Sequence, residues 1–186
     1  MKTLKSIAIG YNVIFWSSVV GVKWYISQVN SIDDVHSTPK SFNQLIYPSN
    51  TFGFYTKDLE NELAMKKVDR LELFKLLVDN VFKLPIYRLE FLLSDSEFNK
   101  DFEMKKDQQM GHFLVESNRL PNQELILRYK LPGFNYRLYI GLIGSQVQMG
   151  FVEYSGSVFQ EYGCRVLLPI LLQGSVNKTL KKLESI

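Results

Sequence analysis

The chain has 186 residues, 46% of them hydrophobic and 22% charged, and a formal net charge of +3 at pH 7. This composition excludes a disordered chain and is typical of one globular domain with an appendage. The small net charge gives no indication of nucleic-acid binding, and the single Cys164 excludes an intramolecular disulfide.

The N-terminal stretch is basic at its start and then apolar. Two lysines precede residues 7–26, and no acidic residue occurs before Asp33. A helix needs about 20 apolar residues to cross a bilayer, and residues 7–26 reach this length only by including a few polar ones. Lys23 lies near the end, where its stem can reach the interface, and Trp24 suits the same level. We therefore predict that residues 1–29 are an N-terminal hydrophobic anchor or signal segment, in contact with the membrane through residues 7–26.

Three interpretations of this segment are open: a single membrane anchor, a cleaved signal peptide, or the buried first helix of a soluble domain. No small-x-small cleavage motif follows it, which disfavours the signal peptide. As an anchor, its basic start favours an N-terminus in the cytosol or the mitochondrial matrix, with the domain across the membrane. The predicted localisation is therefore that of a single-pass membrane protein, in mitochondria or in endomembranes.

Residues 30–50 are rich in Ser, Asn, Asp and Pro, and Pro39 and Pro48 oppose a continuous helix. We predict that they form a linker and that the domain comprises residues 51–186. The first element of the domain is predicted to be a strand at Phe52–Thr56, which is short and aromatic.

Asp58–Leu93 is predicted to be mostly helical, because its apolar residues recur at spacings of three and four. Pro85 divides the stretch, since the residue before a proline is disfavoured in the α region, so a second short helix is expected at Ile86–Leu93. Ser94–Met110 is strongly polar and is predicted to be a solvated loop.

Four runs with the period of two that is typical of strands follow one another along the chain. Turn signals containing Pro, Gly or Asn separate them, so a four-stranded antiparallel meander is expected. The predicted strands are Gly111–Glu116, Glu124–Lys130, Tyr136–Ile143 and Gln146–Tyr154.

Gly156–Ile186 carries one broad apolar stripe with a helical period. Pro169 lies inside it and is predicted to kink the helix without ending it, because the pattern continues on both sides. The expected fold class is α+β, with an antiparallel sheet packed against a long C-terminal helix and an N-terminal membrane-anchor helix.

This order of strand, helix, short helix, meander and long helix resembles the START-like, or helix-grip, superfamily. The phrases Val68-Asp-Arg-Leu-Glu-Leu-Phe74 and Leu84-Pro-Ile-Tyr-Arg-Leu-Glu-Phe-Leu-Leu93 look like a segment in uncharacterised members of that group. The resemblance covers about residues 52–183 and implies a curved sheet that wraps around the C-terminal helix and encloses a cavity. It further implies binding of an apolar small molecule or lipid, sometimes with catalysis. No functional residue can be carried over from the family.

The inner face of the meander is the predicted binding surface. Ordinary packing is the alternative for its aromatic residues, because aromatic side chains favour strands. The predicted lining residues of a cavity are His112, Tyr129, Tyr136, Tyr139, Met149 and Phe151.

Catalysis has one candidate. His112 could act as a general base with Glu116, Glu124 or Glu153, and the alternative is a sheet histidine with a local hydrogen bond. Two histidines and one cysteine cannot assemble a Cys/His metal site, and no glycine loop has phosphate-binding spacing. The sequence therefore predicts no catalytic residue, metal or cofactor, and favours a binding protein over an enzyme.

Two functions follow from these predictions. The first is a membrane-anchored domain that binds an apolar small molecule or lipid. The second is a structural or accessory subunit of a membrane complex, of mitochondria for example, for which a solid core and an exposed apolar patch are expected.

Overall fold

The computed structural model describes residues 17–46, 51–59, 69–93, 104–131, 134–154 and 158–184. Its described part has the α+β architecture that the sequence predicts. The elements, in chain order, are β1 (Asn30–Ser31), η1 (Val35–Ser37), α2 (Lys40–Ile46), β2 (Thr51–Asp58), α4 (Arg70–Phe82), α5 (Pro85–Leu93), β3 (Gln109–Met110), β4 (Phe113–Arg119), η2 (Leu120–Asn122), β5 (Glu124–Leu131), β6 (Phe134–Ile143), β7 (Gln146–Glu153) and α6 (Val158–Glu184).

The strands form one antiparallel sheet in the order β1-β2-β7-β6-β5-β4-β3. The predicted meander is confirmed as β4 to β7, with each strand paired to the next in sequence. The predicted first strand is β2, and it pairs with β7, the last strand in the sequence. The polar stretch predicted to be a loop contributes the short edge strand β3 in its described part, and residues 94–103 lie outside the described ones.

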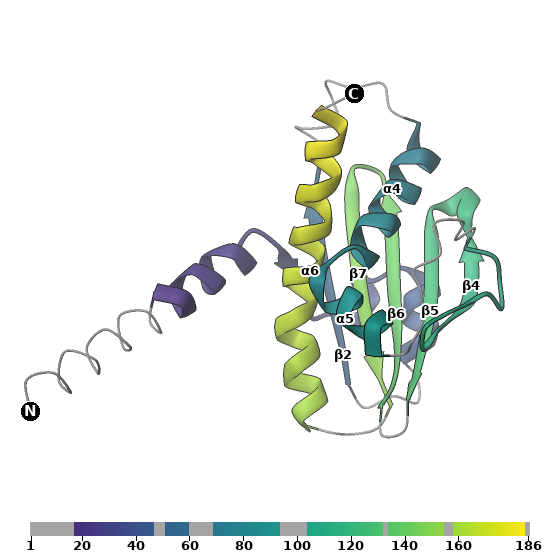
Figure 1. The fold of residues 1–186 in the computed structure, drawn as a ribbon, viewed down its shortest axis with the longest axis horizontal. Helices are drawn as coiled ribbons and strands as arrows, with labels where there is room; N and C mark the ends of the chain where they lie inside the picture. The colour runs from purple at the N-terminus through teal and green to yellow at the C-terminus, as the bar shows by residue number, and fades with distance from the viewer. Residues whose placement is uncertain are drawn as a thin grey trace, which may run out of the picture.

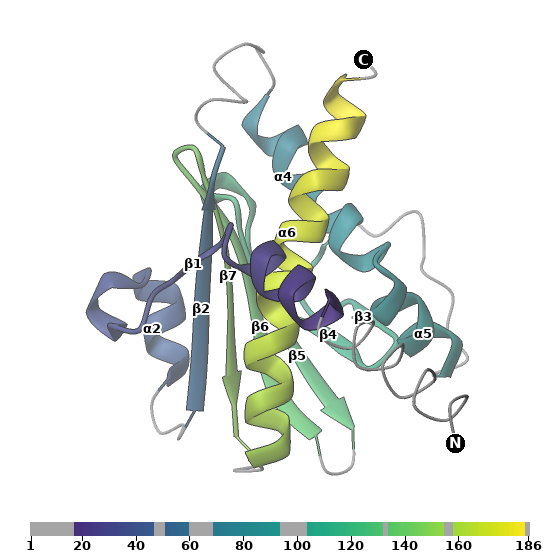
Figure 2. The ribbon, with the colours of Figure 1, turned by 90° about the vertical axis from the view of Figure 1, so that its left-hand side faces the viewer.

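Three helices cover one face of the sheet, which we call the helix side (Figures 1 and 2). The alternate strand residues that face them are apolar, as the period of two requires. Together they form the main core, whose fully buried members include Phe74, Val81, Leu125, Leu127, Ile140, Val147, Met149, Leu172 and Val176.

The helix α6 continues through Pro169, so the proline does not end the helix, as predicted. Further along, Gly174 allows two side chains to approach the helix closely. A Cβ at this position would lie 3.2 Å from Leu84 Cδ2 and 3.6 Å from the Tyr25 hydroxyl oxygen. An added Cβ would therefore require Leu84 to shift by a few tenths of an ångström, whereas its distance to Tyr25 would be an ordinary contact.

The helix α4 is capped at its start by Asp69. The Asp69 carboxylate accepts a hydrogen bond from the Glu72 amide at 3.2 Å, which satisfies one of the free N–H groups of the first turn. The helix ends at Phe82, and α5 starts at Pro85, so the proline separates two helices as expected. The earlier part of the predicted helix, residues 60–68, lies outside the described residues.

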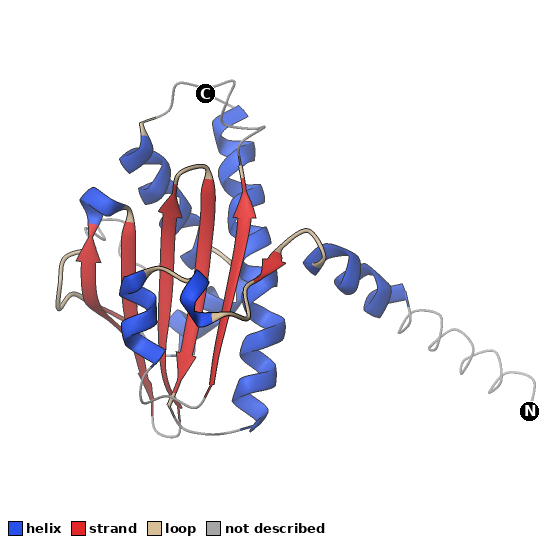
Figure 3. Cartoon of the chain, turned by 180° about the vertical axis from the view of Figure 1, so that it is seen from behind, coloured by secondary structure: helices blue, strands red, loops and turns tan. Residues whose placement is uncertain are grey.

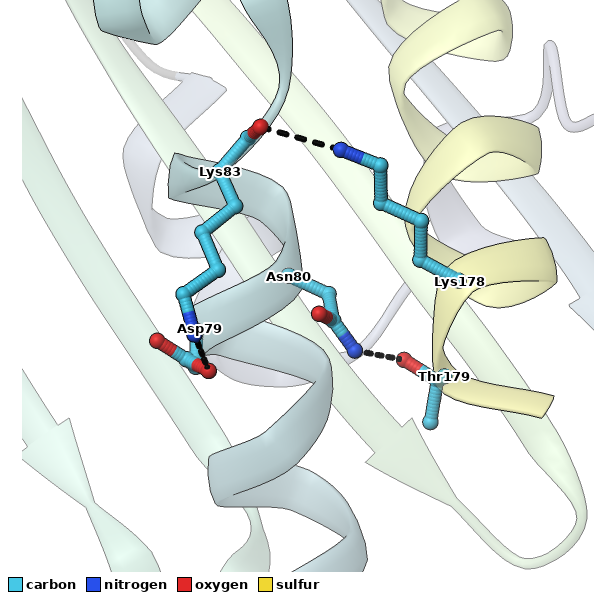
Figure 4. Close-up of polar contacts among 5 residues, drawn as sticks. All are labelled: Asp79, Asn80, Lys83, Lys178 and Thr179. Atoms are coloured by element: carbon cyan, nitrogen blue, oxygen red, sulfur yellow. Dashed lines mark hydrogen bonds and ion pairs between the residues drawn. The ribbon is translucent and has the colours of Figure 1, made fainter. Parts of the chain in front are cut away.

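Polar contacts join α4 to α6 (Figure 4). The buried Asn80 amide donates to the Thr179 hydroxyl at 3.0 Å, and that hydroxyl donates to the Ser175 carbonyl. Nearby, Lys178 Nζ donates to the Lys83 carbonyl at 2.9 Å, beyond the last turn of α4. The Asn80–Thr179 contact satisfies buried groups that would otherwise lie between the helices without partners.

The opposite face of the sheet, which we call the outer face, is covered by α2 (Figure 3). Residues 30–46, which the sequence places in a linker, fold against the sheet, and β1 adds an edge strand to β2. The Pro39 carbonyl accepts the first helical hydrogen bond from Asn43, so this proline starts α2 where it was expected to oppose a helix. Phe42 is fully buried against the sheet.

A glycine makes room for this second layer. A Cβ at Gly150 would lie 2.5 Å from the Phe42 ring and 2.7 Å from the Phe54 ring. The rings of the outer face therefore sit directly on the backbone of β7. Together with Ile126 and Val152, the rings of Phe42, Phe54 and Tyr139 form a small core on this face.

Residues 17–26 are helical and project from the domain beside α6 (Figures 1 and 2). Val20 is 63% exposed and Trp24 67%, which disagrees with a buried first helix for this stretch. The helix is held at its end, where Gln173 of α6 donates to Gln28 at 2.7 Å. Among the residues that the structure describes, no helix has both the length and the hydropathy required to span a membrane. The first half of the predicted anchor, residues 7–16, lies outside them.

Candidate functional site

One end of the helix side carries a row of aromatic side chains across neighbouring strands. Phe113 of β4 pairs with Tyr129 of β5, and Tyr129 pairs with Tyr136 of β6. The row continues to Glu153 of β7, which pairs with Tyr136. Because paired residues share a face of the sheet, these four side chains point to the same side.

The rings of this row are in contact. Tyr129 and Tyr136 stack with their centroids 4.8 Å apart and their planes at 20°, and Phe113 lies 4.8 Å from Tyr129. The helices contribute further rings: the ring centroids of Phe82 of α4 and Tyr87 of α5 lie 5.7 and 5.5 Å from that of Phe113. We call the seven residues His112, Phe113, Tyr129, Tyr136, Phe82, Tyr87 and Phe91 the aromatic cluster.

The aromatic cluster reaches the surface at one side. Phe82 and Phe113 are buried, whereas Tyr129, Tyr136 and His112 are partly exposed. The His112 ring meets Tyr129 edge-on, with centroids 5.8 Å apart. Offset and edge-on contacts of this kind are the favoured geometries of aromatic rings. The cluster thus presents a partly exposed aromatic surface at the end of the sheet–helix interface.

The structure brings together three of the six predicted lining residues: His112, Tyr129 and Tyr136. Met149 and Phe151 also face the helix side, but both are fully buried within the main core. Tyr139 points to the outer face, where it packs against Phe42. Its position follows from the period of two, because Tyr139 is an odd number of residues from Tyr136 on the same strand.

Tyr139 belongs to a buried polar group that holds α2 to the sheet. Its hydroxyl donates to Glu124 Oε1 at 3.0 Å, and the Ser41 hydroxyl of α2 donates to the same oxygen at 2.6 Å. Burial, followed by the negative charge of Glu124, raises the pKa of Tyr139 well above its usual value. The carboxylate is therefore satisfied by two neutral donors, and its role in the described residues is to position α2.

In the described residues, the three carboxylates proposed to act with His112 are bound to other side chains or lie several strands away. Glu116 binds Arg137 in a two-pronged ion pair, and Glu124 binds Ser41 and Tyr139 on the outer face. Glu153 shares the helix side with the aromatic cluster, but β5 and β6 lie between β4 and β7. Three strand spacings amount to about 14 Å, far beyond the reach of a hydrogen bond.

No group of three His, Cys, Asp or Glu residues that could hold a metal ion occurs among the described residues. The side chain of Cys164 lies outside the described ones. The site that remains is apolar and aromatic, with tyrosine hydroxyls and one imidazole at its rim. Such a surface can bind and orient an apolar molecule.

Sequence reasoning missed the contributions of Phe82, Tyr87 and Phe91 to the aromatic cluster. The helical period predicts that the apolar residues of α4 face the core, but it does not say which end of the sheet they meet. The positions of α4 and α5 relative to the strands depend on contacts between residues far apart in the chain. No local signal could have supplied them.

Comparisons with known proteins identify no relative. No family model, no curated protein and no solved structure matches the chain.

Proposed function

We propose that the protein is a membrane-anchored domain that binds an apolar small molecule or lipid at the aromatic cluster. The observation that carries this proposal is the stack of Tyr129 and Tyr136, which lies on the helix side yet remains partly exposed. Partly exposed tyrosine rings give an apolar ligand a large contact area.

The resemblance to the helix-grip superfamily supports the same proposal. An antiparallel sheet with a C-terminal helix packed on one face is the arrangement that the resemblance implies. In that arrangement the ligand enters between the sheet and the helix. The part of the interface around Leu172 and Val176 is fully buried. A ligand would therefore meet the domain first at the aromatic end.

The proposed anchor is residues 7–26, and its described half supports the assignment. Val20, Val22 and Trp24 are exposed on a helix that projects from the domain. Exposed apolar side chains are unfavourable in water and favourable in a bilayer, with tryptophan suited to the interface. The protein would then be a single-pass membrane protein, in mitochondria or in endomembranes.

The attachment of this helix to α6 determines which face the domain would turn toward the membrane. Tyr25 and Gln28 contact Gly174 and Gln173 in the middle of α6. The exposed residues of α6, among those whose side chains the structure describes, are Arg165, Val166, Leu167, Lys178, Lys181, Lys182 and Glu184. Two of them are apolar and four are basic. Apolar and basic side chains together suit a surface of anionic lipids.

The anchor is tested by carbonate extraction of membranes that carry the full chain with a C-terminal tag. Retention of full-length protein in the membrane pellet is the expected result. Release of the full-length chain into the soluble fraction would contradict the anchor. Appearance of a shortened chain would instead favour a cleaved signal peptide.

Ligand binding is tested by titrating the full chain, in neutral detergent, with a fluorescent fatty acid. We expect saturable binding that weakens at least tenfold in Tyr136→Ala. The matched control is Phe52→Ala, which removes a partly buried ring from the outer face and is expected to leave binding unchanged. Equal loss in both variants, or no saturable binding to the unmodified chain, would contradict the site.

The second candidate is a structural or accessory subunit of a membrane complex. The observation that favours it is the exposure of large apolar side chains on the helices, with Leu92 of α5 77% exposed. Such residues are typical of surfaces that contact another protein. Stoichiometric co-purification of one partner protein, lost in Leu92→Asp, together with no fatty-acid binding, would support this function over the first.

A further inference from the structure

Two arginines face each other on the outer face of the sheet. Arg128 of β5 pairs in register with Arg137 of β6, so their side chains leave the sheet on the same side about 5 Å apart at the Cβ atoms. Like charges directly opposite each other on neighbouring strands are destabilising unless something neutralises them. A negative charge nearby would therefore stabilise the two arginines.

Arg137 has its partners. Its Nε and one terminal nitrogen both donate to the Glu116 carboxylate, the latter at 2.7 Å. Its guanidinium also lies 4.9 Å from the centre of the Tyr154 ring. The hydrogen bonds from Arg137 lower the pKa of Glu116, and those to Glu116 raise the pKa of Arg137. Glu116 thus accepts both of these hydrogen bonds from Arg137, and the charge of Arg128 lowers the pKa of Glu116 further.

Arg128 forms no ion pair or hydrogen bond of this kind with the described residues. Its side chain is only partly exposed, and its Nε is buried without a hydrogen-bond partner. An arginine side chain carries five N–H donors, and leaving a buried one unpaired costs free energy. Among these three described side chains, two guanidinium groups face one carboxylate, which leaves one positive charge in excess.

We propose that Arg128, with Arg137 beside it, binds an oxyanion of a soluble small molecule, either a carboxylate or a phosphate. A guanidinium matches the geometry of both groups and holds them by paired N–H donors. The anion would supply the hydrogen-bond acceptor that Arg128 Nε lacks and would offset the second positive charge. This site lies on the opposite face of the sheet from the aromatic cluster and does not depend on the proposed function.

The test is a titration of the 15N-labelled full chain, in neutral detergent, with inorganic phosphate and separately with succinate at constant ionic strength. The arginine Nε–Hε resonances in the NMR spectrum are followed. We expect a saturable shift of the Arg128 resonance with at least one of the two ions. The ion that saturates at the lower concentration identifies whether the ligand is a phosphate or a carboxylate.

The variant Arg128→Met removes the charge and keeps a chain that can fill the same space. Its affinity for the ion is expected to fall at least tenfold, and the ion should no longer raise its melting temperature. The matched control is Arg88→Met on α5, an exposed arginine on the other side of the sheet, which is expected to bind within twofold of the unmodified chain. Should Arg128→Met fail to fold, Arg128→Lys keeps the charge without the paired donors and is expected to bind more weakly.

Two results would overturn the proposal. One is the absence of a saturable Arg128 shift with both ions. The other is equal ion affinity in the Arg128 and Arg88 variants, because binding would then be independent of this site.

Discussion

The two faces of the sheet are closed by different means. The helix side is covered by α4, α5 and α6 over a continuous apolar core, with polar groups such as Asn80 and Thr179 confined to the contact between helices. The outer face is covered by the seven-residue helix α2 over a core of five buried residues, next to a buried carboxylate and a group of charged side chains. The comparison indicates that the stability of the domain comes mainly from the helix side.

The proposed sites follow the same division. The aromatic cluster on the helix side is apolar and suits a lipid, whereas the Arg128 position on the outer face is charged and suits a small anion. Each prediction below changes one face and leaves the other intact.

The largest effect is expected for Phe82→Ala on the helix side. Phe82 is buried and touches Tyr87, Phe91 and Phe113, so its removal leaves a large cavity and should lower the free energy of unfolding by about 4 kcal/mol. Urea unfolding followed by circular dichroism measures the change. The exposed Leu92→Ala is the control, with a loss of less than about 0.5 kcal/mol expected.

Phe42→Ala tests the outer face. Its ring packs against Phe54 and Tyr139, and we expect a loss of about 3 kcal/mol in the global free energy of unfolding. A loss below about 1 kcal/mol, with faster hydrogen exchange limited to residues 30–46, would mean that α2 opens separately from the sheet. In that case the segment would behave as the linker that its composition suggests.

Tyr139 makes the outer face sensitive to alkali. Its pKa is raised on folding, so the protonated form contributes stability that is complete below the unfolded value of about 10 and declines as the pH rises above it. The decline is at most about 1.4 kcal/mol per pH unit. Tyr139→Phe should lose less stability than the unmodified chain between pH 10 and 11, measured by urea unfolding. Parallel curves for the two proteins over this range would contradict the assignment.

The smallest effect is expected at Glu116. Its pKa is lowered on folding by the hydrogen bonds from Arg137, so its contribution is present above the unfolded value near 4.5 and is lost as the pH falls through the folded value. The pair is about one quarter to one third exposed, so solvent limits it to about 1 kcal/mol. Glu116→Gln should therefore lower stability at pH 7, and this loss should shrink as the pH falls below about 4.5. A loss that stays constant down to the lowest pH at which the protein folds would point to packing as the cause.

Much of the helix side could be predicted from local pattern. The period of two in β4 to β7 and the apolar stripe of α6 depend on neighbouring residues in the chain. The side chains that share a face of each element can therefore be predicted before any tertiary contact is known. The break at Pro85 has the same origin, because a proline restricts the residue before it. These signals also place Tyr129 with Leu125 and Leu127 on one face of its strand, and Tyr136 with Leu138 and Ile140 on one face of the next.

The outer face could not be predicted in this way. α2 has seven residues, too few for a helical period, and it stands in a segment whose composition is that of a linker. Its position depends on Phe42 filling the space that Gly150 leaves on a strand more than 100 residues away, and on Ser41 reaching Glu124. Contacts between residues so far apart carry no periodic signal.

The sequence by itself determined the fold class, the order of the strands in the meander and the projection of alternate residues to opposite faces. Only the tertiary structure decided which residues meet: His112 beside Tyr129, Tyr139 beside Glu124, and Arg128 opposite Arg137. The physical reason is that backbone geometry repeats locally, whereas the register between strands and the docking of helices depend on how whole side chains fill shared space.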